Sequence, residues 1–139
     1  MMAVDTNLLI YAHRADSPFH ARALDVLRRT AARAWAVPAP CLHEFLAVTT
    51  HPRVFDPPTT PEDARETLRK WLASPTLSIL VETPGYWEVL DRTLATSKVT
   101  GPRVHDARIA ALCLHHGVEE LLSADRDFSR FRLSTRNPL

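Results

Sequence analysis

The fold is decided by residues 3–13, which read AVDTNLLIYAH. Ala3 to Asp5 predict the start of a short apolar strand, which leads into a helix from Asn7 to His13. Asp5, the acid at the junction, can accept hydrogen bonds from the first free amides of that helix, as an N-cap does. Because a strand that passes directly into a helix is the first half of a βαβ unit, this stretch favours an α/β protein.

The same alternation continues along the chain. Further strands are expected at residues 35–37, 77–81 and 120–123, with a final edge strand at Leu133. Helices are expected to start at the caps Ser17 and Thr60 and to span residues 41–49, 86–96 and 106–116, with a short turn or helix at 125–131. Strands that alternate with helices pair in parallel. The predicted fold is therefore α/β, a three-layer α/β/α sandwich around a central, mostly parallel sheet.

Length and composition indicate an ordinary globular protein. The chain has 139 residues, so residues 1–139 are expected to form a single domain. Hydrophobic residues make up 45% and charged residues 24%, which argues against disorder and fibres. No apolar run approaches the ~18 residues of a membrane-spanning helix, and no basic segment precedes the first apolar stretch as in a secretory signal. Cys41 and Cys113 lie in apolar patterns and are expected to be buried thiols, which suits the cytoplasm.

Several chemistries are excluded by missing motifs. The three glycines form neither a dinucleotide-binding pattern nor a P-loop. His43 opens a zincin-like pattern, but Ala47 stands where the second histidine is required. His115 and His116 directly precede Gly117 and are typical of a helix C-terminus rather than of a metal site. Since the net charge is only +1, any contact with a polyanion has to be local.

Four carboxylates stand at positions that a parallel sheet would bring together. Asp5 and Asp125 each follow an expected strand, and Asp106 heads a helix after a loop. Glu44 lies within a nearly continuous apolar helix, where an acid is expected to be poorly solvated. Taken singly, each aspartate can also be a helix cap or a turn residue. Ligands of open parallel sheets nevertheless bind outside the carboxyl ends of the strands, so a shared site is expected there.

Converging carboxylates restrict the chemistry of such a site. Like charges at close range raise one another's pKa, so the cluster requires protons or a cation. No set of cysteine or histidine ligands is available, and oxygen ligands favour Mg²⁺ or Mn²⁺. Such an ion can lower the pKa of a water and hold a phosphodiester for in-line attack. The residues therefore predict a metal-dependent site for phosphoryl or phosphodiester chemistry.

Four segments, in this order, resemble the motifs of the PIN-domain nucleases. They are residues 4–7 (VDTN), 41–45 (CLHEF), 106–111 (DARIAA) and 123–128 (SADRDF). Ser123 stands where the family usually has threonine, which keeps the hydroxyl group. The similarity spans the chain from residue 3 to the end and is closest to the VapC-type toxins of toxin–antitoxin pairs.

The resemblance implies an endoribonuclease that depends on Mg²⁺ or Mn²⁺ and is inhibited by a VapB-type antitoxin. It implies the following roles: Asp5, Glu44, Asp106 and Asp125 as acidic catalytic residues, the three aspartates among them as metal ligands, Asp127 as an auxiliary acid, and Asn7 and Ser123 as hydrogen-bonding supports. It also implies a homodimer that forms a hetero-oligomer with the antitoxin. The expected helix face of Leu68, Trp71 and Leu72 offers apolar surface for the dimer.

Other functions remain open from the sequence. A DNA nuclease or an RNA-processing nuclease of the same fold would need no antitoxin, and a binding protein could retain the fold without catalysis. A phosphoacceptor receiver domain needs paired acids after the first strand and a lysine after a late strand. Here Thr6 follows Asp5, and Lys70 and Lys98 lie in or beside helices, which disfavours that class.

Overall fold

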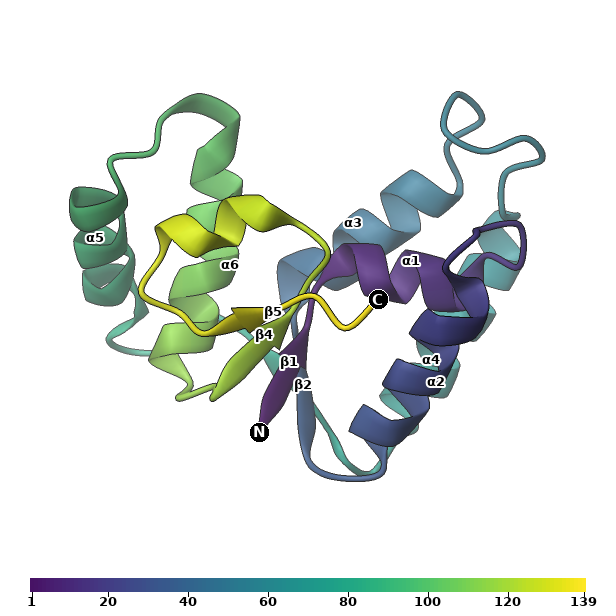
Figure 1. The fold of residues 1–139 in the computed structure, drawn as a ribbon, viewed down its shortest axis with the longest axis horizontal. Helices are drawn as coiled ribbons and strands as arrows, with labels where there is room; N and C mark the ends of the chain where they lie inside the picture. The colour runs from purple at the N-terminus through teal and green to yellow at the C-terminus, as the bar shows by residue number, and fades with distance from the viewer.

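A computed structural model describes residues 1–139 as a five-stranded sheet with helices on both sides (Figure 1). The strands follow the order β3-β2-β1-β4-β5, and all four pairs are parallel. They are β1 (Met2–Val4), β2 (Trp35–Pro38), β3 (Leu77–Leu80), β4 (Glu120–Leu122) and β5 (Thr135–Arg136). The predicted α/β/α sandwich is confirmed, and the sheet is parallel throughout.

Six α-helices form the outer layers, with α1 to α4 on one side of the sheet and α5 and α6 on the other (Figure 1). They are α1 (Thr6–His13), α2 (His20–Ala31), α3 (Ala39–Thr49), α4 (Pro61–Leu72), α5 (Tyr86–Ser97) and α6 (Val104–His115), with short 3₁₀ turns η1 (Gly101–Arg103) and η2 (Arg126–Arg130). None of the helices is long and apolar enough to cross a bilayer.

The strand order reverses direction beside β1. From β1 the chain moves outward through β2 to β3, whereas β4 returns to the other side of β1 and β5 follows it. Ala3 at the centre is fully buried and pairs with both Ala36 and Leu121. In open parallel sheets, ligands bind at the carboxyl ends of the strands at such a switch point. The topology therefore predicts a ligand site at the residues that directly follow β1 and β4.

Helix α6 lies close against this part of the sheet because its inner face carries small side chains. Ala107, Ala110 and Ala111 are fully buried. The helix begins at Val104, so Asp106 stands in its first turn and not at its head as expected. The Gly117 turn after His116 ends the helix, with the Val118 amide donating to the carbonyl of Cys113 at 2.9 Å. This confirms a helix C-terminus at the histidine pair.

Two expected boundaries are wrong. Helix α2 begins at His20, because the hydroxyl of Ser17 accepts the amide of Phe19 at 3.1 Å and forms a local turn in place of a helix cap. The edge strand β5 forms at residues 135–136, because the side chain of Leu133 is buried in the core just before it.

The expected apolar face of α4 is mostly used within the chain. Leu68 and Trp71 pack against the core, and the ring of Trp71 meets that of Phe45 edge-on with centroids 4.7 Å apart. Leu72 alone of the three is largely exposed, at 48%. This face therefore does not supply the surface that was expected for a homodimer, and the dimer stays a prediction without it.

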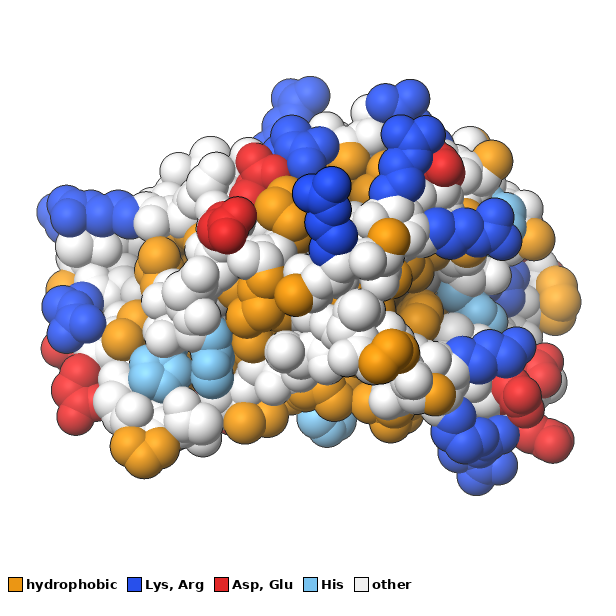
Figure 2. Space-filling view, turned by 90° about the horizontal axis from the view of Figure 1, so that it is seen from below, with side chains coloured by type: hydrophobic (Ala, Val, Ile, Leu, Met, Phe, Trp, Pro, Cys, Tyr) orange, Lys and Arg blue, Asp and Glu red, His pale blue; other side chains and the backbone are white.

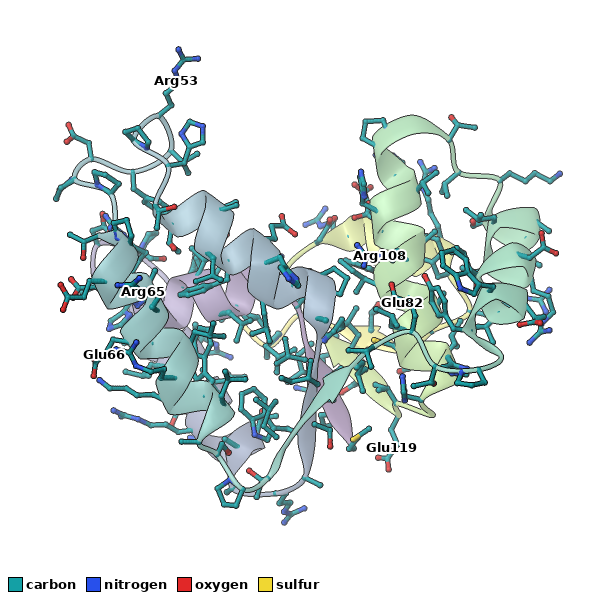
Figure 3. All side chains as sticks on the ribbon, turned by 180° about the vertical axis from the view of Figure 1, so that it is seen from behind. Arg53, Arg65, Glu66, Glu82, Arg108 and Glu119 are labelled. Atoms are coloured by element: carbon teal, nitrogen blue, oxygen red, sulfur yellow. The ribbon has the colours of Figure 1, made fainter.

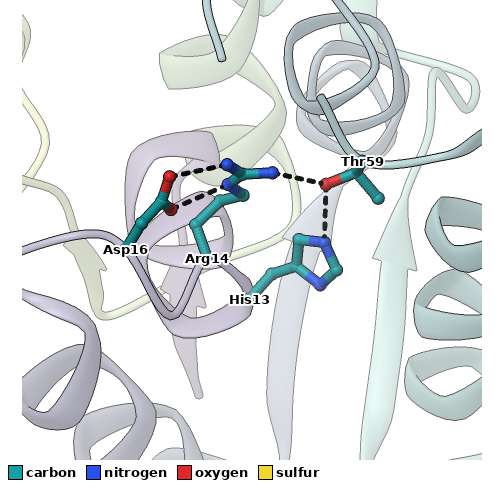
Figure 4. Close-up of polar contacts among 4 residues, drawn as sticks. All are labelled: His13, Arg14, Asp16 and Thr59. Carbon is teal, nitrogen blue, oxygen red and sulfur yellow. Dashed lines mark hydrogen bonds and ion pairs between the residues drawn. The ribbon is translucent and has the colours of Figure 1, made fainter. Parts of the chain in front are cut away.

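A polar cluster ties the end of α1 to the loop before α4 (Figure 4). His13 Nε2 lies 3.0 Å from Thr59 Oγ1, and Thr67 Oγ1 lies 3.2 Å from His13 Nδ1. Arg14 donates to both carboxylate oxygens of Asp16 and to Thr59 Oγ1. Desolvation lowers the pKa of His13 below its usual value, since burial disfavours the imidazolium.

Candidate metal centre

Asp5 is held at the carboxyl end of β1 by three donors. Its Oδ1 accepts the Thr6 amide at 2.8 Å and the Cys41 thiol at 3.5 Å, while Oδ2 accepts the Ser123 hydroxyl at 2.7 Å. The residue is only 5% exposed, and burial raises the pKa of Asp5 despite these hydrogen bonds. Asp5 is thus both the N-cap of α1 and a fixed, buried carboxylate, so the two explanations that the sequence left open apply together.

Three carboxylates gather beside it. Oxygens of Asp106, Asp125 and Asp127 lie within 4.8 Å of one another. Asp106 comes from the first turn of α6, and the other two come from the turn after β4, where Asp125 Oδ1 accepts the Asp127 amide at 2.8 Å. Burial and the charges of Asp125 and Asp127 raise the pKa of Asp106. The repulsion among these groups favours a bound cation.

Asp127 therefore lies inside the carboxylate cluster, although the family resemblance implied only an auxiliary role for it. The reason is local. Asp125 caps the 3₁₀ turn η2, and this capping places the third residue of the SADRDF segment and the fifth on the same side of the turn. The sequence shows two acids, Asp125 and Asp127, separated by one residue. The alternation of strands and helices does not predict the direction of their side chains.

Asp5 and Glu44 lie outside the three-carboxylate cluster but border it. The Ser123 hydroxyl connects Asp5 to the turn, because it donates to Asp5 and accepts the amide of Asp125 at 3.0 Å. Thr6 Oγ1 donates to Glu44 Oε2 at 3.1 Å. The charge of Glu44 also contributes to the raised pKa of both Asp5 and Asp106. All four predicted acids thus surround one region at the edge of the sheet.

Glu44 is exposed, which corrects the expectation of a poorly solvated acid. The buried residues of α3 are Cys41, Leu42, Phe45 and Thr49, and Glu44 lies off the face that they form. The Glu44 carboxylate is therefore accessible to solvent water, whereas that of Asp5 is buried. His43 is exposed as well, as expected, and its Nδ1 lies 2.8 Å from the carbonyl oxygen of Ala39.

Asn7 and Ser123 both hydrogen-bond to the turn that carries Asp125. Asn7 Oδ1 accepts the Ala124 amide at 3.3 Å, and Ser123 bridges Asp5 and Asp125 as described. Cys41 is a further support that sequence analysis missed, because its buried thiol was taken only as core. Its pairing with Asp5 could not be found from the sequence, because it depends on how α3 packs against the start of α1.

The donor set fits a hard divalent cation. The three candidate ligands of the cluster are all carboxylates, and such ligands suit Mg²⁺ or Mn²⁺. Burial holds the pKa of the Cys41 thiol well above its usual range, so this cysteine stays protonated and is no metal ligand. The chemistry of the residues thus agrees with an oxygen-only metal site.

Arginines approach this region from two sides. Arg103 Nη1 lies 2.7 Å from Asp127 Oδ2. On the side of α6 that faces α3, Arg108 donates two hydrogen bonds to Glu82 Oε1 at 3.2 and 2.9 Å (Figure 3). A surface pocket of about 370 Å³ between α3 and α6 is lined by Glu44, His105 and Arg108 among others. The acidic region is therefore bordered by basic side chains.

A parallel sheet with an oxygen-rich carboxylate site at its switch point defines a class of α/β proteins suited to metal-dependent phosphodiester chemistry. The chain belongs to the PIN-domain family, whose sequence profile matches residues 2–133. Among curated relatives, ribonuclease VapC43 of Mycobacterium tuberculosis is 37% identical over 142 aligned positions, covering 100% of this chain and 96% of the relative. Ribonuclease VapC48 of the same organism is 34% identical, covering 96% and 94%.

Solved structures share the fold at low sequence identity. VapBC2 of Rickettsia felis, bound to a DNA fragment from its promoter, has a TM-score of 0.71 at 16% identity and covers 98% of this chain and 97% of that one. The M. tuberculosis toxin VapC20, which cleaves the sarcin–ricin loop, also has a TM-score of 0.71 at 16% identity and covers 93% of each chain. These likenesses support the PIN fold independently of the sequence relatives.

Proposed function

We propose that the chain is a metal-dependent endoribonuclease that acts as the toxin of a toxin–antitoxin pair. The observation that carries this proposal is the cluster of Asp106, Asp125 and Asp127 at the carboxyl edge of the sheet. It is supported by relatives named as VapC ribonucleases that match nearly the whole chain at 34% to 37% identity.

The side chains suggest a division of roles. Asp5, Asp106 and Asp125 would hold Mg²⁺ or Mn²⁺, with Asp127 beside them. When bound, such an ion acts as a Lewis acid on a phosphodiester and lowers the pKa of a water. Glu44 is exposed at the rim, where it can accept the proton of an attacking water. Ser123 and Thr6 fix the orientation of Asp5 and Glu44 by hydrogen bonds.

The proposed partner is a VapB-type antitoxin encoded beside the toxin. Structures of the same fold include the VapBC2 pair and a toxin–antitoxin complex from Klebsiella pneumoniae, which supports a partner of this kind. An arginine from such a partner could reach the exposed carboxylates by charge-assisted hydrogen bonds. The free thiols Cys41 and Cys113 suit a reducing compartment, and we propose a cytoplasmic location.

The test begins with purified protein and total RNA. Cleavage is expected with Mg²⁺ or Mn²⁺ and should stop when EDTA is added. Asp106→Asn should lose activity, whereas Asp25→Asn on the distant helix α2 should retain it. Cleavage that resists EDTA after a second purification would contradict the metal-dependent mechanism.

The toxin role needs a test in cells. Expression of the chain alone should arrest growth, and coexpression of the neighbouring reading frame should relieve the arrest. Sequencing of RNA ends after a short pulse of expression would identify the target. Cleavage without growth arrest would instead indicate an RNA-processing nuclease without an antitoxin.

A further inference from the structure

A surface pocket of about 630 Å³ lies directly beside the carboxylate cluster. Its lining carries acidic and basic side chains as well as uncharged ones. The charged residues that line it are Lys98, Arg103, Asp106, Asp127 and Arg130. Two of them belong to the cluster itself, so the pocket opens onto the site of the proposed reaction.

Arg103 is a basic residue of this lining that contacts the cluster. It ends the η1 turn, one position before α6 begins and three before Asp106. Its Nη1 pairs with Asp127 Oδ2 at 2.7 Å, and the two side chains are 39% and 43% exposed. Ion pairs at this exposure are weak and easily exchanged. The single contact also leaves most of the N–H donors of the guanidinium free for another acceptor.

We propose that Arg103 binds a phosphate of the RNA strand at the edge of the carboxylate cluster. Asp127 positions its guanidinium, and Lys98 and Arg130 contact neighbouring phosphates of the same strand. This inference rests on the proposed ribonuclease function and assigns the part of the surface that receives the substrate.

The physical argument is one of charge complementarity. A phosphodiester that approaches carboxylates is repelled unless cations compensate its negative charge. A metal ion at the cluster compensates this charge only on the side of the phosphodiester that faces the metal. A guanidinium on the opposite side can donate two parallel hydrogen bonds to the phosphate oxygens. A cation at the cluster also neutralises part of the charge of Asp127. The contact with Asp127 then weakens but still orients the guanidinium, and its free N–H donors can bind the phosphate.

The basic residues at the amino ends of the strands do not have this arrangement. The amino ends of the strands face the viewer in Figure 2, where Lys and Arg side chains gather along the upper and right-hand rims. A pocket of about 900 Å³ at that end is lined by Arg22, Arg29, Arg33 and Arg136. Arg29 is paired there with Asp25 at 2.8 Å, and no carboxylate cluster adjoins it. Arg29 is therefore a matched control for Arg103.

The experiment compares Arg103→Gln with Arg29→Gln, both combined with Glu44→Gln to slow cleavage while the proposed metal ligands stay intact. Binding of a labelled single-stranded RNA is measured by fluorescence anisotropy with Mn²⁺ at several salt concentrations. R103Q should weaken RNA binding by about tenfold, as expected for a charged hydrogen bond. It should also reduce the slope of log K against log salt by about 0.7, the value for one phosphate contact on a single strand. R29Q should change neither quantity.

A second readout is Mn²⁺ affinity without RNA, measured by calorimetry. Because R103Q removes a positive charge beside the cluster, Mn²⁺ should bind several-fold more tightly, while R29Q should leave its affinity unchanged. Arg103→Lys keeps the charge and loses the planar fork, so its RNA affinity should lie between those of the parent and R103Q. Opposite changes in RNA and Mn²⁺ affinity are not expected from mere damage to the fold.

Two results would overturn the inference. One is an R103Q protein whose RNA affinity and salt slope equal those of R29Q. The other is a parallel loss of RNA and Mn²⁺ affinity, which would assign Arg103 to maintenance of the cluster. In either case, metal-dependent cleavage by the parent would leave the proposed function intact. Failure of the parent to bind or cleave RNA with any divalent cation would instead remove the proposed function.

Discussion

Replacement of Asp5 separates its two roles, helix cap and site carboxylate. Asp5→Ala removes the acceptor of the Thr6 amide and of the Ser123 hydroxyl, both of which are buried. Each buried donor left without a partner costs about 1–3 kcal/mol, so D5A, which leaves two of them, should lose roughly 2–6 kcal/mol. At about 4 °C per kcal/mol for a domain of this size, its melting temperature should fall by about 8–24 °C.

Asp5→Asn should behave differently. The amide oxygen still accepts from Thr6, and asparagine caps a helix about as well as aspartate. The amide NH2 that replaces Oδ2 can donate to Ser123 Oγ, so the contact with Ser123 is kept with its direction reversed. The substitution also removes a buried negative charge that burial and Glu44 disfavour. Metal-free D5N should therefore melt at the temperature of the parent or above it. Its activity should fall by orders of magnitude, because water activation depends on the carboxylate cluster.

Thermal melts with and without Mg²⁺, together with RNA cleavage rates, test this prediction. At 100 times its dissociation constant, Mg²⁺ should stabilise the parent by about 2.7 kcal/mol through linkage, and D5N by less. Asp25→Asn, an exposed substitution on α2, should match the parent throughout. An active D5N protein with an unaltered Mg²⁺ response would reduce Asp5 to a helix cap and refute its role in the site.

The raised pKa of Asp5 adds a pH signature. The folded state binds this proton more tightly than the unfolded state, so ionisation of Asp5 costs the metal-free parent stability at neutral pH. As pH falls through the folded-state pKa towards the usual value, the parent regains that stability. Any advantage of D5N over the parent should therefore shrink as pH falls from 7 towards about 4.

Three further predictions concern the rest of the molecule. Since burial lowers the pKa of His13, the parent should lose stability as pH falls below about 6.5. In urea titrations His13→Gln should lose part of this pH dependence, and the exposed control His43→Gln should keep it. Equal pH profiles of stability for H13Q and the parent would contradict the role of His13. Cys41 and Cys113, whose pKa values burial raises, that of Cys113 to about 12, should resist a thiol reagent in the native protein and react after unfolding; rapid native labelling would show that they are accessible. Sedimentation at micromolar concentration should show a homodimer, and a single species of 15.6 kDa would exclude it.

The sequence by itself determined the alternation of strands and helices and the positions of the acids relative to them. Both are local properties: apolar runs, caps such as Thr60 and the Gly117 stop are set by residues a few positions apart. Once the strands are parallel, their carboxyl ends must share one edge, so Asp5 and the SADRDF segment were expected to meet. The Ser123–Asp5 hydrogen bond at 2.7 Å agrees with this expectation.

Only the tertiary structure decided how the side chains divide the site. It places Asp127 with Asp106 and Asp125, buries the side chain of Asp5, and leaves that of Glu44 exposed at the rim. The direction of a side chain depends on turn geometry and on partners far away in the chain, and neither is encoded in periodicity. For the same reason the Arg103–Asp127 pair could not be predicted from the sequence, because it joins two separate turns, η1 and η2, that meet only when α6 packs beside η2.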